Sequence, residues 1–361
     1  MSFHGSAPQP APPEEKSTWL HTFGHRVWKH NINPRQCPAG DRLTTDGIEF
    51  IAGFAVALVT TFVIVPWLIP RLKARGVIGK DLNKPNKPEV AEMGGIAVVV
   101  GLFAGVGVLV ALDGIDNIDL LNVSLSAALG AAFVGMLDDL FNLRQRHKAI
   151  LPFLIALPFA ASADERVVIP HIIELEFGPW MIVVAAFAVT CAANAANMLE
   201  GFNGLGTGLG IIMSLTLILL SIQHDRMDGV YLLVPLVGAL TAFLWYNKYP
   251  AKVFPGDTMM LFMGASLAIA GILSNLEVQT AFIFLPLIVE FFLKMRGHFE
   301  AENYSMNATN GYLEYHGKIE SLTHIFMRHL RINEKEIVAL IWGLELAICV
   351  FVIAVDTLFL N

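Results

Sequence analysis

Ten apolar segments constrain the fold of this chain more than any other feature of its sequence. A helix needs about 20 residues to cross a bilayer, and hydrophobic residues make up 55% of the 361 positions. The segments lie at 48–70, 94–112, 119–137, 150–163, 180–197, 204–222, 229–246, 258–274, 279–294 and 336–357. The segment at 150–163 is short and has two prolines, so it could be re-entrant instead of spanning. The sequence predicts an all-α polytopic integral membrane protein with about ten transmembrane helices, and it excludes a soluble globular enzyme and a nucleic-acid-binding module.

The first 47 residues differ in composition from the rest of the chain. Residues 1–15 are rich in Pro, Ala and polar residues, which predicts a disordered segment. Apolar residues then recur at helical spacing between Trp19 and Trp28, which favours an amphipathic helix on the membrane surface over an unstructured tail. We expect a tail at 1–47 and a membrane domain at 48–361.

Basic residues predict the orientation of the membrane domain. Of the 24 Lys and Arg residues, 17 lie in loops that follow odd-numbered segments and only two, Arg166 and Arg226, follow even-numbered ones. Because loops rich in Lys and Arg remain in the cytoplasm, we expect the odd-numbered loops to be cytoplasmic. Both termini then face outward.

Polar residues that could take part in chemistry gather in the same five loops. A transporter places its ionisable residues near the middle of the membrane, whereas here they lie at one interface, and the sequence has no internal repeat. This asymmetry favours an enzyme that joins a water-soluble cytoplasmic substrate to a membrane lipid. A transporter for a lipid-linked or nucleotide-linked sugar is the alternative from another class.

Two adjacent carboxylates end the third segment. Asp138 and Asp139 repel each other and need a cation or a proton nearby, and Asn142 lies on the same helical face as Asp138. The basic residues of 144–148 could supply charge for phosphates. The simpler interpretation is a capped helix end followed by a basic stop signal.

Neutral amides and one further carboxylate occupy two other loops. Asn194 and Asn197 share a helical face, and Asn203 precedes a turn; such amides can bind Mg²⁺ or a base edge, or satisfy a broken helix backbone. Asp257 directly precedes the eighth segment, where it could cap the helix or bind a metal. Phe254 could stack on a base.

The remaining two polar loops lie at 79–95 and 295–335. Lys80 and Asp81 in the first could hold an anionic substrate, or could belong to an ordinary positive-inside loop. The second is long enough to fold over a site as a lid, or could be a solvated loop. Its four histidines lack the spacing of a zinc site.

In combination and in order, these motifs resemble those of the polyprenyl-phosphate N-acetylhexosamine-1-phosphate transferases. The resemblance covers about residues 48–357. It rests on Asp138-Asp139 followed by Asn-Leu-Arg-x-Arg-His-Lys, on Asn-x-x-Asn with a later Asn-Gly, and on Phe-x-Gly-Asp-Thr. The loops at 81–84 and 138–148 are most similar to the eukaryotic dolichyl-phosphate GlcNAc-1-phosphate transferase and its archaeal counterparts.

The resemblance implies a reaction and a set of site residues. A lipid phosphate attacks the β-phosphate of a UDP-sugar, UMP leaves and a lipid diphosphate-sugar remains. The implied metal ligands, for Mg²⁺ or alternatively Mn²⁺, are Asn197 and Asp257. The implied catalytic residues are Asp138, Asp139 and Lys148. The implied substrate-binding residues are Lys80, Asp81, Leu82, Glu92, Asn142, Asn203, Phe254, Arg296 and His298, and the 295–335 loop is the lid.

The chemistry of phosphates limits what these residues must do. A phosphate monoester has a second pKa near 6, so it is largely ionised at cytoplasmic pH and needs no strong general base. Asp138 then orients the acceptor or accepts its residual proton. A covalent aspartyl-phosphate step is an alternative.

The implied partners are UDP-GlcNAc, a polyprenyl phosphate of the dolichyl type and the lipid bilayer, with a homodimer permitted by the exposed faces of the spans. The product would begin lipid-linked glycan synthesis of the N-glycan type in an archaeal-type cell membrane or the ER membrane. Alternatives within the same class are another UDP-N-acetylhexosamine and undecaprenyl phosphate.

Overall fold

The computed structural model describes residues 39–360 apart from 113, 114, 116, 165, 170–172, 306 and 310. Contacts divide the chain into two units, Met1–Thr44 and Thr45–Asn361. In the first unit the described residues form the start of helix α2. The disordered segment and the amphipathic helix predicted for residues 1–28 lie outside the described residues and stay predictions.

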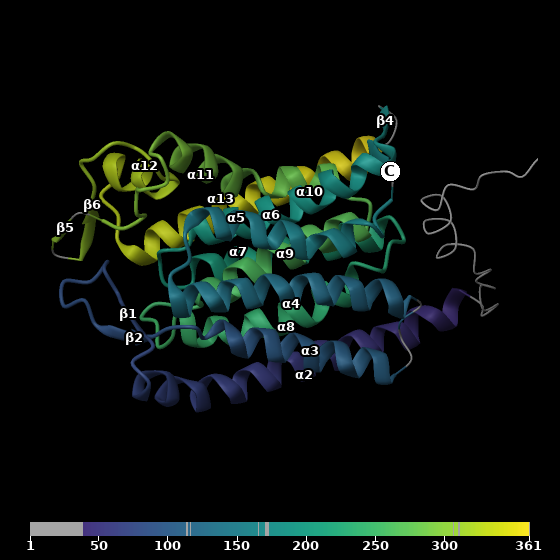
Figure 1. Ribbon diagram of the computed structural model, residues 1–361, viewed down its shortest axis with the longest axis horizontal. Coiled ribbons are helices and arrows are strands. Elements are labelled where there is room, and N and C mark those ends of the chain that lie inside the picture. The colour runs from purple at the N-terminus through teal and green to yellow at the C-terminus, as the bar shows by residue number, and fades with distance from the viewer. Residues whose placement is uncertain are drawn as a thin grey trace, which may run out of the picture. The chain divides into compact units, whose positions relative to one another are not determined.

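The described residues form mainly helices (Figure 1). The helices are α2 (Ala39–Ala74), α3 (Gly95–Ala111), α4 (Ile118–Phe141), α5 (Gln145–Ala160), α6 (Met181–Leu199), α7 (Leu205–Gln223), α8 (Val230–Asn247), α9 (Gly256–Leu273), α10 (Glu277–Ile283), α11 (Leu285–Arg296), α12 (Leu322–His329) and α13 (Glu334–Val355). A short 3₁₀-helix, η1 (Gly178–Trp180), precedes α6, and a π-helix, η2 (Asp356–Leu360), follows α13.

Three short antiparallel hairpins join the helices. They pair β1 (Ile78–Lys80) with β2 (Glu89–Ala91), β3 (Arg166–Ile169) with β4 (Ile173–Glu176), and β5 (Asn307–Thr309) with β6 (Tyr312–Glu314). The fold is therefore the predicted all-α membrane type, with hairpins confined to loops. The predicted lid at 295–335 is folded in its described part, since it holds β5, β6 and α12.

The prediction of about ten spans is wrong in number. All ten apolar segments contain helix, but among the described residues seven helices are long and apolar enough to cross a membrane, or eight if one bent pair counts as a span. That pair is α10 and α11, which meet at 62°, where Pro286 in the first turn of α11 breaks the helix. Helix α3 has 17 residues, and α5 has 16 residues and two prolines.

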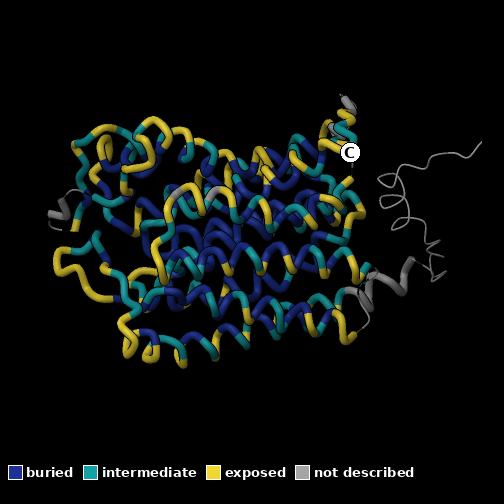
Figure 2. Tube along the Cα trace, in the orientation of Figure 1, coloured by how far each residue is buried: buried dark blue, intermediate teal, exposed yellow. Residues whose placement is uncertain are grey.

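Helix α9 forms the centre of the bundle. Its residues from Thr258 to Ile272 are all buried, as expected of a helix that is apolar on every side. Figure 2 shows the buried residues concentrated in the middle layer of helices. Helices α4 and α6 pack directly on α9, and glycines allow this close approach: a Cβ on Gly135 of α4 would lie 2.3 Å from the Asp257 carbonyl oxygen, and one on Gly264 would lie 2.4 Å from the Ala192 carbonyl oxygen.

Replacing Gly135 should therefore force α4 away from the start of α9. We expect Gly135→Ala to lower the free energy of unfolding by about 1–3 kcal/mol, because overpacking displaces backbone here and not a flexible side chain. Thermal unfolding of the purified protein in detergent measures this. Gly107→Ala is the matched control, since a Cβ there meets nothing within 4 Å. A Gly135→Ala protein as stable as the wild type would contradict the close packing.

The hairpin β1–β2 is joined to the loop before α9. The N–H groups of Gly94 and Gly95 donate to the carbonyls of Phe254 and Pro255, both at 2.9 Å, and the Phe254 N–H donates to Ala91 at 2.8 Å. Figure 1 shows β1, β2, β5, β6 and α12 at one end of the bundle and β4 at the other. The polar loops predicted to share one membrane interface thus lie together.

Candidate active site

Two polar cavities lie between these loops and the adjacent helix ends. Cavity A, of about 190 Å³, is lined by Lys80, Asp81, Leu82, Glu92, Asn197, Glu200, Gly201, Phe202, Asn203, Phe254, Pro255, Gly256, Asp257 and Tyr304. Cavity B, of about 250 Å³, is lined by Lys148, Asn194, Asn197, Met198, Glu200, Lys294, Phe299, Ala301, Glu302, Asn303 and Tyr304. Asn197, Glu200 and Tyr304 line both, so the two cavities share a wall.

An ammonium between two carboxylates lies beside this shared wall. Lys148 Nζ forms ion pairs with Asp138 and with Asp257 Oδ2, the latter at 2.8 Å. Asn197 contacts the Asp257 carboxylate from α6. The Leu143 N–H donates to Asp138 Oδ1 at 2.6 Å, which closes the end of α4. The cluster therefore collects two carboxylates, one cation and one amide from four segments of the chain.

Asp139 has a different position from its neighbour. Its carboxylate accepts the N–H of Asp257 at 2.7 Å and the N–H and hydroxyl of Thr258 at 3.0 and 2.6 Å. The two N–H groups belong to the first turn of α9, where backbone donors lack partners within the helix. Gly256 at φ +69° makes room, because a Cβ there would lie 2.7 Å from Asp139 Oδ2. Asp139 thus caps α9 from another helix, and Asp257 does not cap its own helix.

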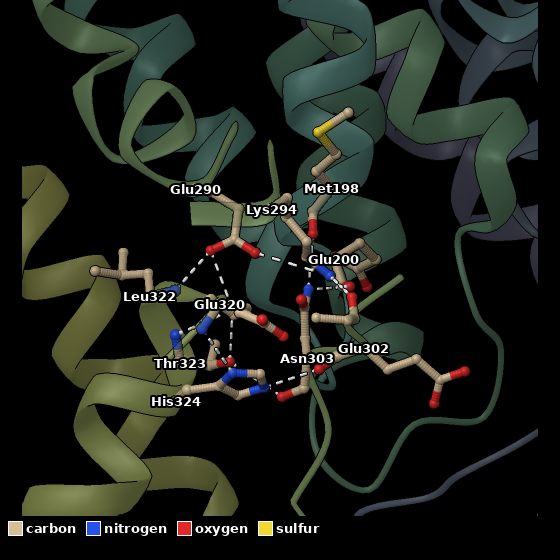
Figure 3. A network of polar contacts seen from close by, with 12 residues as sticks. Met198, Glu200, Glu290, Lys294, Glu302, Asn303, Glu320, Leu322, Thr323 and His324 are labelled. Carbon is tan, nitrogen blue, oxygen red and sulfur yellow. Dashed lines mark hydrogen bonds and ion pairs between the residues drawn. The ribbon is translucent and has the colours of Figure 1, made fainter. Parts of the chain in front are cut away.

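The 295–335 loop is attached to the bundle by a network of buried hydrogen bonds (Figure 3). Asn303 Nδ2 donates to the carbonyls of Met198 and Glu200, both at 2.8 Å. Glu290 Oε2 accepts the Leu322 N–H at 2.7 Å and the Ser321 hydroxyl at 3.0 Å, so it caps α12. The network fixes residues 301–304, which form one side of cavity B.

His324 is a buried part of the same network. Its Nε2 lies 2.8 Å from the Glu302 carbonyl, and its Nδ1 accepts the Glu320 N–H at 3.3 Å. The ring stacks on Tyr315 with centroids 3.6 Å apart. Burial lowers the pKa of His324, and because Nδ1 acts as an acceptor, the ring is neutral. Its contacts hold residues 302, 320 and 324 of this loop together.

Burial and carboxylates shift the pKa of several groups in the cavities. Burial, followed by the charges of Asp139 and Asp257, raises the pKa of Glu92. Burial raises the pKa of Glu200 to about 7, partly offset by the Gly206 N–H that its carboxylate accepts at 2.9 Å. Burial and the nearby Glu200 raise the pKa of Tyr304 to about 12, so its hydroxyl stays protonated. Burial disfavours the charged form of Lys148, but Asp257 and Asp138 raise its pKa overall.

Most of the residues singled out from the sequence lie together at these cavities. Cavity A is lined by eight of them: Lys80, Asp81, Leu82, Glu92, Asn197, Asn203, Phe254 and Asp257. Lys148 lines cavity B and contacts Asp138. Five others line neither cavity in the described structure: Asp138 and Asp139, which pair with Lys148 and with the start of α9, and Asn142, Arg296 and His298. Asn142 ends α4 as an exposed left-handed C-cap, Arg296 is exposed and donates to the Ile319 carbonyl, and His298 is exposed.

Sequence reasoning missed four residues of the site. Glu200 lies between the two asparagine motifs, and this position could have identified it. Lys294 is buried and lines cavity B where Arg296 was expected. Tyr304 lines both cavities, and Glu334 binds the Asn203 N–H at 3.1 Å. Neither of the last two belongs to a motif, since only the tertiary fold brings them to the site.

The donor atoms near Asp257 fit a magnesium ion. Within the described residues, no group of three or more His, Cys, Asp or Glu side chains could hold a metal. Mg²⁺, however, commonly takes only one or two carboxylates and completes its octahedron with water and substrate phosphates. Asp257 and Asn197, which line cavity A, supply one carboxylate and one amide oxygen of that kind.

Known proteins are similar to this chain over most of its length. The family model of glycosyl transferase family 4 matches residues 121–275, which include Asp138, Lys148, Asn197 and Asp257. A relative from Saccharolobus solfataricus, provisionally named UDP-N-acetylglucosamine–dolichyl-phosphate N-acetylglucosaminephosphotransferase, is 36% identical over 315 residues, 86% of this chain and 96% of the relative. A relative of the same provisional name from Sulfolobus acidocaldarius is 34% identical over the same shares of both chains.

A relative from Saccharomyces cerevisiae named UDP-N-acetylglucosamine–dolichyl-phosphate N-acetylglucosaminephosphotransferase is 31% identical over 296 residues, 66% of this chain and 65% of the relative. The archaeal relatives match nearly their whole length, so the similarity is not limited to one motif. The chain therefore belongs to glycosyl transferase family 4, among the polyprenyl-phosphate N-acetylhexosamine-1-phosphate transferases that its motifs resemble.

Proposed function

We propose that this protein transfers GlcNAc-1-phosphate from UDP-GlcNAc to a polyprenyl phosphate of the dolichyl type. The products are UMP and polyprenyl-diphosphate-GlcNAc, and the active end of the bundle faces the cytoplasm of the cell. The observation that carries the proposal is the Asp138–Lys148–Asp257 cluster beside two cavities that share a wall. The names of the archaeal and yeast relatives support the substrates.

The reaction forms one bond and breaks one bond at phosphorus. An oxygen of the lipid phosphate attacks the β-phosphorus of UDP-GlcNAc, and the bond from that phosphorus to the bridging oxygen breaks. The electron pair leaves with UMP. Such a transfer depends mainly on in-line positioning and on neutralising charge, which the residues around the two cavities can provide.

Cavity A is suited to the nucleotide. Phe254 offers a ring on which uracil can stack, and Asn203 and the Leu82 backbone offer hydrogen bonds to the base edge. The diphosphate then lies toward Asp257 and Lys148. The ammonium of Lys148 remains charged because the two carboxylates stabilise it, so it can neutralise phosphate oxygens. Asp138, held by Lys148 and the Leu143 N–H, orients the acceptor phosphate.

Asp257 and Asn197 would hold Mg²⁺, or alternatively Mn²⁺. The ion, when bound, supplies positive charge to the diphosphate oxygens and withdraws electron density from phosphorus. Activity that survives complete removal of divalent cations by EDTA would contradict the metal assignment. Measuring the binding of UDP-GlcNAc with and without Mg²⁺ gives a second readout that does not depend on turnover.

Glu200 should give the enzyme a pH dependence near neutrality. Because the folded pKa of about 7 lies above the ordinary 4.5, the carboxyl is neutral below pH 7 and adds a negative charge to both cavities above it. We expect the KM for UDP-GlcNAc to rise roughly 3- to 10-fold between about pH 6 and pH 8, through repulsion of the diphosphate. The same pKa shift favours folding most below pH 4.5, and this contribution is lost as the pH rises through about 7.

Steady-state kinetics of the wild type and Glu200→Gln across this pH range test the assignment. The glutamine keeps an acceptor for the Gly206 N–H, so the site is preserved while the charge is removed. We expect the rise in KM to disappear in the variant. An identical pH profile in both proteins would show that another group titrates.

The proposal is tested by incubating the purified protein with UDP-GlcNAc, dolichyl phosphate and Mg²⁺, and then separating the nucleotide and lipid products. UMP together with a lipid-linked GlcNAc supports it. Substituting another UDP-N-acetylhexosamine or undecaprenyl phosphate distinguishes the sibling transferases. If no nucleotide product forms with any of these pairs, the proposal fails and a sugar transporter becomes the better hypothesis.

A further inference from the structure

A buried polar cluster next to cavity A is not explained by the reaction alone. It consists of Asp81, Lys84, Asn203 and Glu334, which we name the Lys84 cluster. Asp81 and Asn203 line cavity A, whereas Glu334 comes from the first turn of α13. Asp81, Asn203 and Glu334 are only 4%, 6% and 5% exposed. Two carboxylates this deeply buried are costly unless a cation and hydrogen bonds compensate them.

Ion pairs and hydrogen bonds join all four residues of the Lys84 cluster. Lys84 Nζ contacts the Asp81 carboxylate and lies 3.3 Å from Glu334 Oε2. Asn203 Nδ2 donates to Asp81 Oδ2 at 3.0 Å, and the Asn203 backbone N–H donates to Glu334 Oε1 at 3.1 Å. Glu334 therefore holds the main chain of Asn203, Asp81 holds its side chain, and Lys84 joins the two carboxylates.

These contacts fix which atom of the Asn203 amide can serve a ligand. An ionised carboxylate only accepts hydrogen bonds, so the NH₂ group of Asn203 must face Asp81. The carbonyl oxygen of the amide is then the atom available to a base in cavity A. An acceptor suits the N3–H of uracil, which is a donor, and repels the unprotonated N3 of cytosine, which is an acceptor.

We propose that Lys84 and Glu334 are positioning residues that lock the Asn203 amide, so that cavity A selects uridine over cytidine nucleotides. This inference rests on the proposed function, because it assigns cavity A to the base of a nucleotide. It extends that function to base selectivity and to residues that do not touch the substrate.

Helix α13 holds Glu334 rigidly in place. The Trp342 indole N–H, two turns further along α13, donates to the Leu205 carbonyl at 3.0 Å. The same ring packs so closely on α7 that a Cβ at Gly208 would lie 2.1 Å from it. Since α7 begins at Leu205, two residues after Asn203, these contacts hold α13 against the start of α7.

Removing Lys84 should allow the Asn203 amide to rotate. Asp81 and Glu334 would then lack their shared cation, and the repulsion between the two carboxylates would displace Asp81 from the Asn203 amide. Without that fixed acceptor, the amide can turn and present its NH₂ group to the cavity. The turned amide suits cytosine and rejects uracil.

The test compares the binding of UMP and CMP to the full-length protein in detergent with Mg²⁺, by isothermal titration calorimetry. We expect the ratio of UMP to CMP affinity to fall roughly 10- to 100-fold in Lys84→Met and in Glu334→Gln, as for other residues that orient a ligand-binding group. Lys84→Arg keeps the charge between the carboxylates and should retain the ratio. Glu336→Gln is the matched control, because this substitution removes the same charge from the same helix turn. Glu336 is exposed, and its side chain accepts the Asn333 N–H in the capping box of α13.

The outcomes separate this inference from the proposed function. A wild-type protein that does not bind UMP would contradict the proposed function itself. A wild type that prefers UMP, with the same preference in Lys84→Met and Glu334→Gln, would overturn only the positioning role. An equal loss of affinity for UMP and CMP would overturn it as well, because it would indicate general disruption of the site. Should Glu334→Gln not fold, Glu334→Asp provides a second test: it keeps the charge beside Lys84 but withdraws the carboxylate from the Asn203 N–H, and it should lower the ratio as well.

Discussion

Asp257→Ala should reduce turnover by at least about 1,000-fold. The Asp257 carboxylate lines cavity A, contacts Asn197 and binds Lys148 Nζ at 2.8 Å, so one substitution removes a metal ligand and releases a cation from its position. The Lys148–Asp138 ion pair persists in the variant, and we therefore expect the fold to survive. Initial rates of product formation at saturating Mg²⁺ measure the effect, together with the melting temperature.

Asp119→Ala is the control for this substitution. Asp119 is exposed in the first turn of α4, at the opposite end of that helix from Asp138, so its removal changes the same net charge without touching the site. Asp257→Ala with turnover within a few-fold of the wild type would rule out Asp257 as a metal ligand. A loss of Mg²⁺-dependent UDP-GlcNAc binding in the variant would support the assignment independently of turnover.

Asp139→Asn should lower kcat by about 100-fold through displacement of Asp257 and not through loss of a reacting group. The carboxylate accepts three hydrogen bonds from Asp257 and Thr258, and an asparagine can accept on one oxygen only. We expect the KM for UDP-GlcNAc to change much less than kcat. The unfolding free energy should fall by about 1–3 kcal/mol, because buried donors are left without partners.

Thr258→Val provides the comparison that distinguishes positioning from direct catalysis. It removes only the hydroxyl that donates to Asp139 at 2.6 Å, and it should show a smaller loss of the same kind. The two changes act on one contact, so the double variant should be less impaired than the sum of the single variants predicts. If Asp139→Asn abolishes turnover with unchanged stability while Thr258→Val has no effect, Asp139 acts directly on substrate.

The general fold follows from the sequence because membrane spans are long and apolar. The number of spans does not follow from the sequence, because composition cannot distinguish a helix that crosses the membrane from an apolar segment that bends within it. Pro286 shows this difficulty: it lies within an apolar run at 279–294, yet the run divides into α10 and α11 at 62°. The short hairpins were also missed, since three- and four-residue strands carry too little periodicity to detect.

The site residues were predictable from the sequence where a single loop contains a recognisable motif. The adjacent Asp138 and Asp139 were recognisable because a pair of carboxylates at a helix end is costly, but their separate positions were not. Only the packing of α4 on α9 shows that Asp139 binds backbone while its neighbour binds Lys148. Glu334 and Tyr304 carry no local signal at all. Glu334 lies 131 residues after Asn203, whose N–H it accepts, and Tyr304 lies outside every motif that lines cavity A with it.

The fate of the β-phosphate tests the central claim most directly. The purified protein would be given UDP-GlcNAc labelled with ³²P in the β-position, together with dolichyl phosphate and Mg²⁺, and the lipid and aqueous phases would be counted separately. Transfer of GlcNAc-1-phosphate predicts that the label enters the lipid phase in equal amount to the UMP released. Label retained in the aqueous phase as UDP, with GlcNAc alone on the lipid, would contradict the proposed reaction.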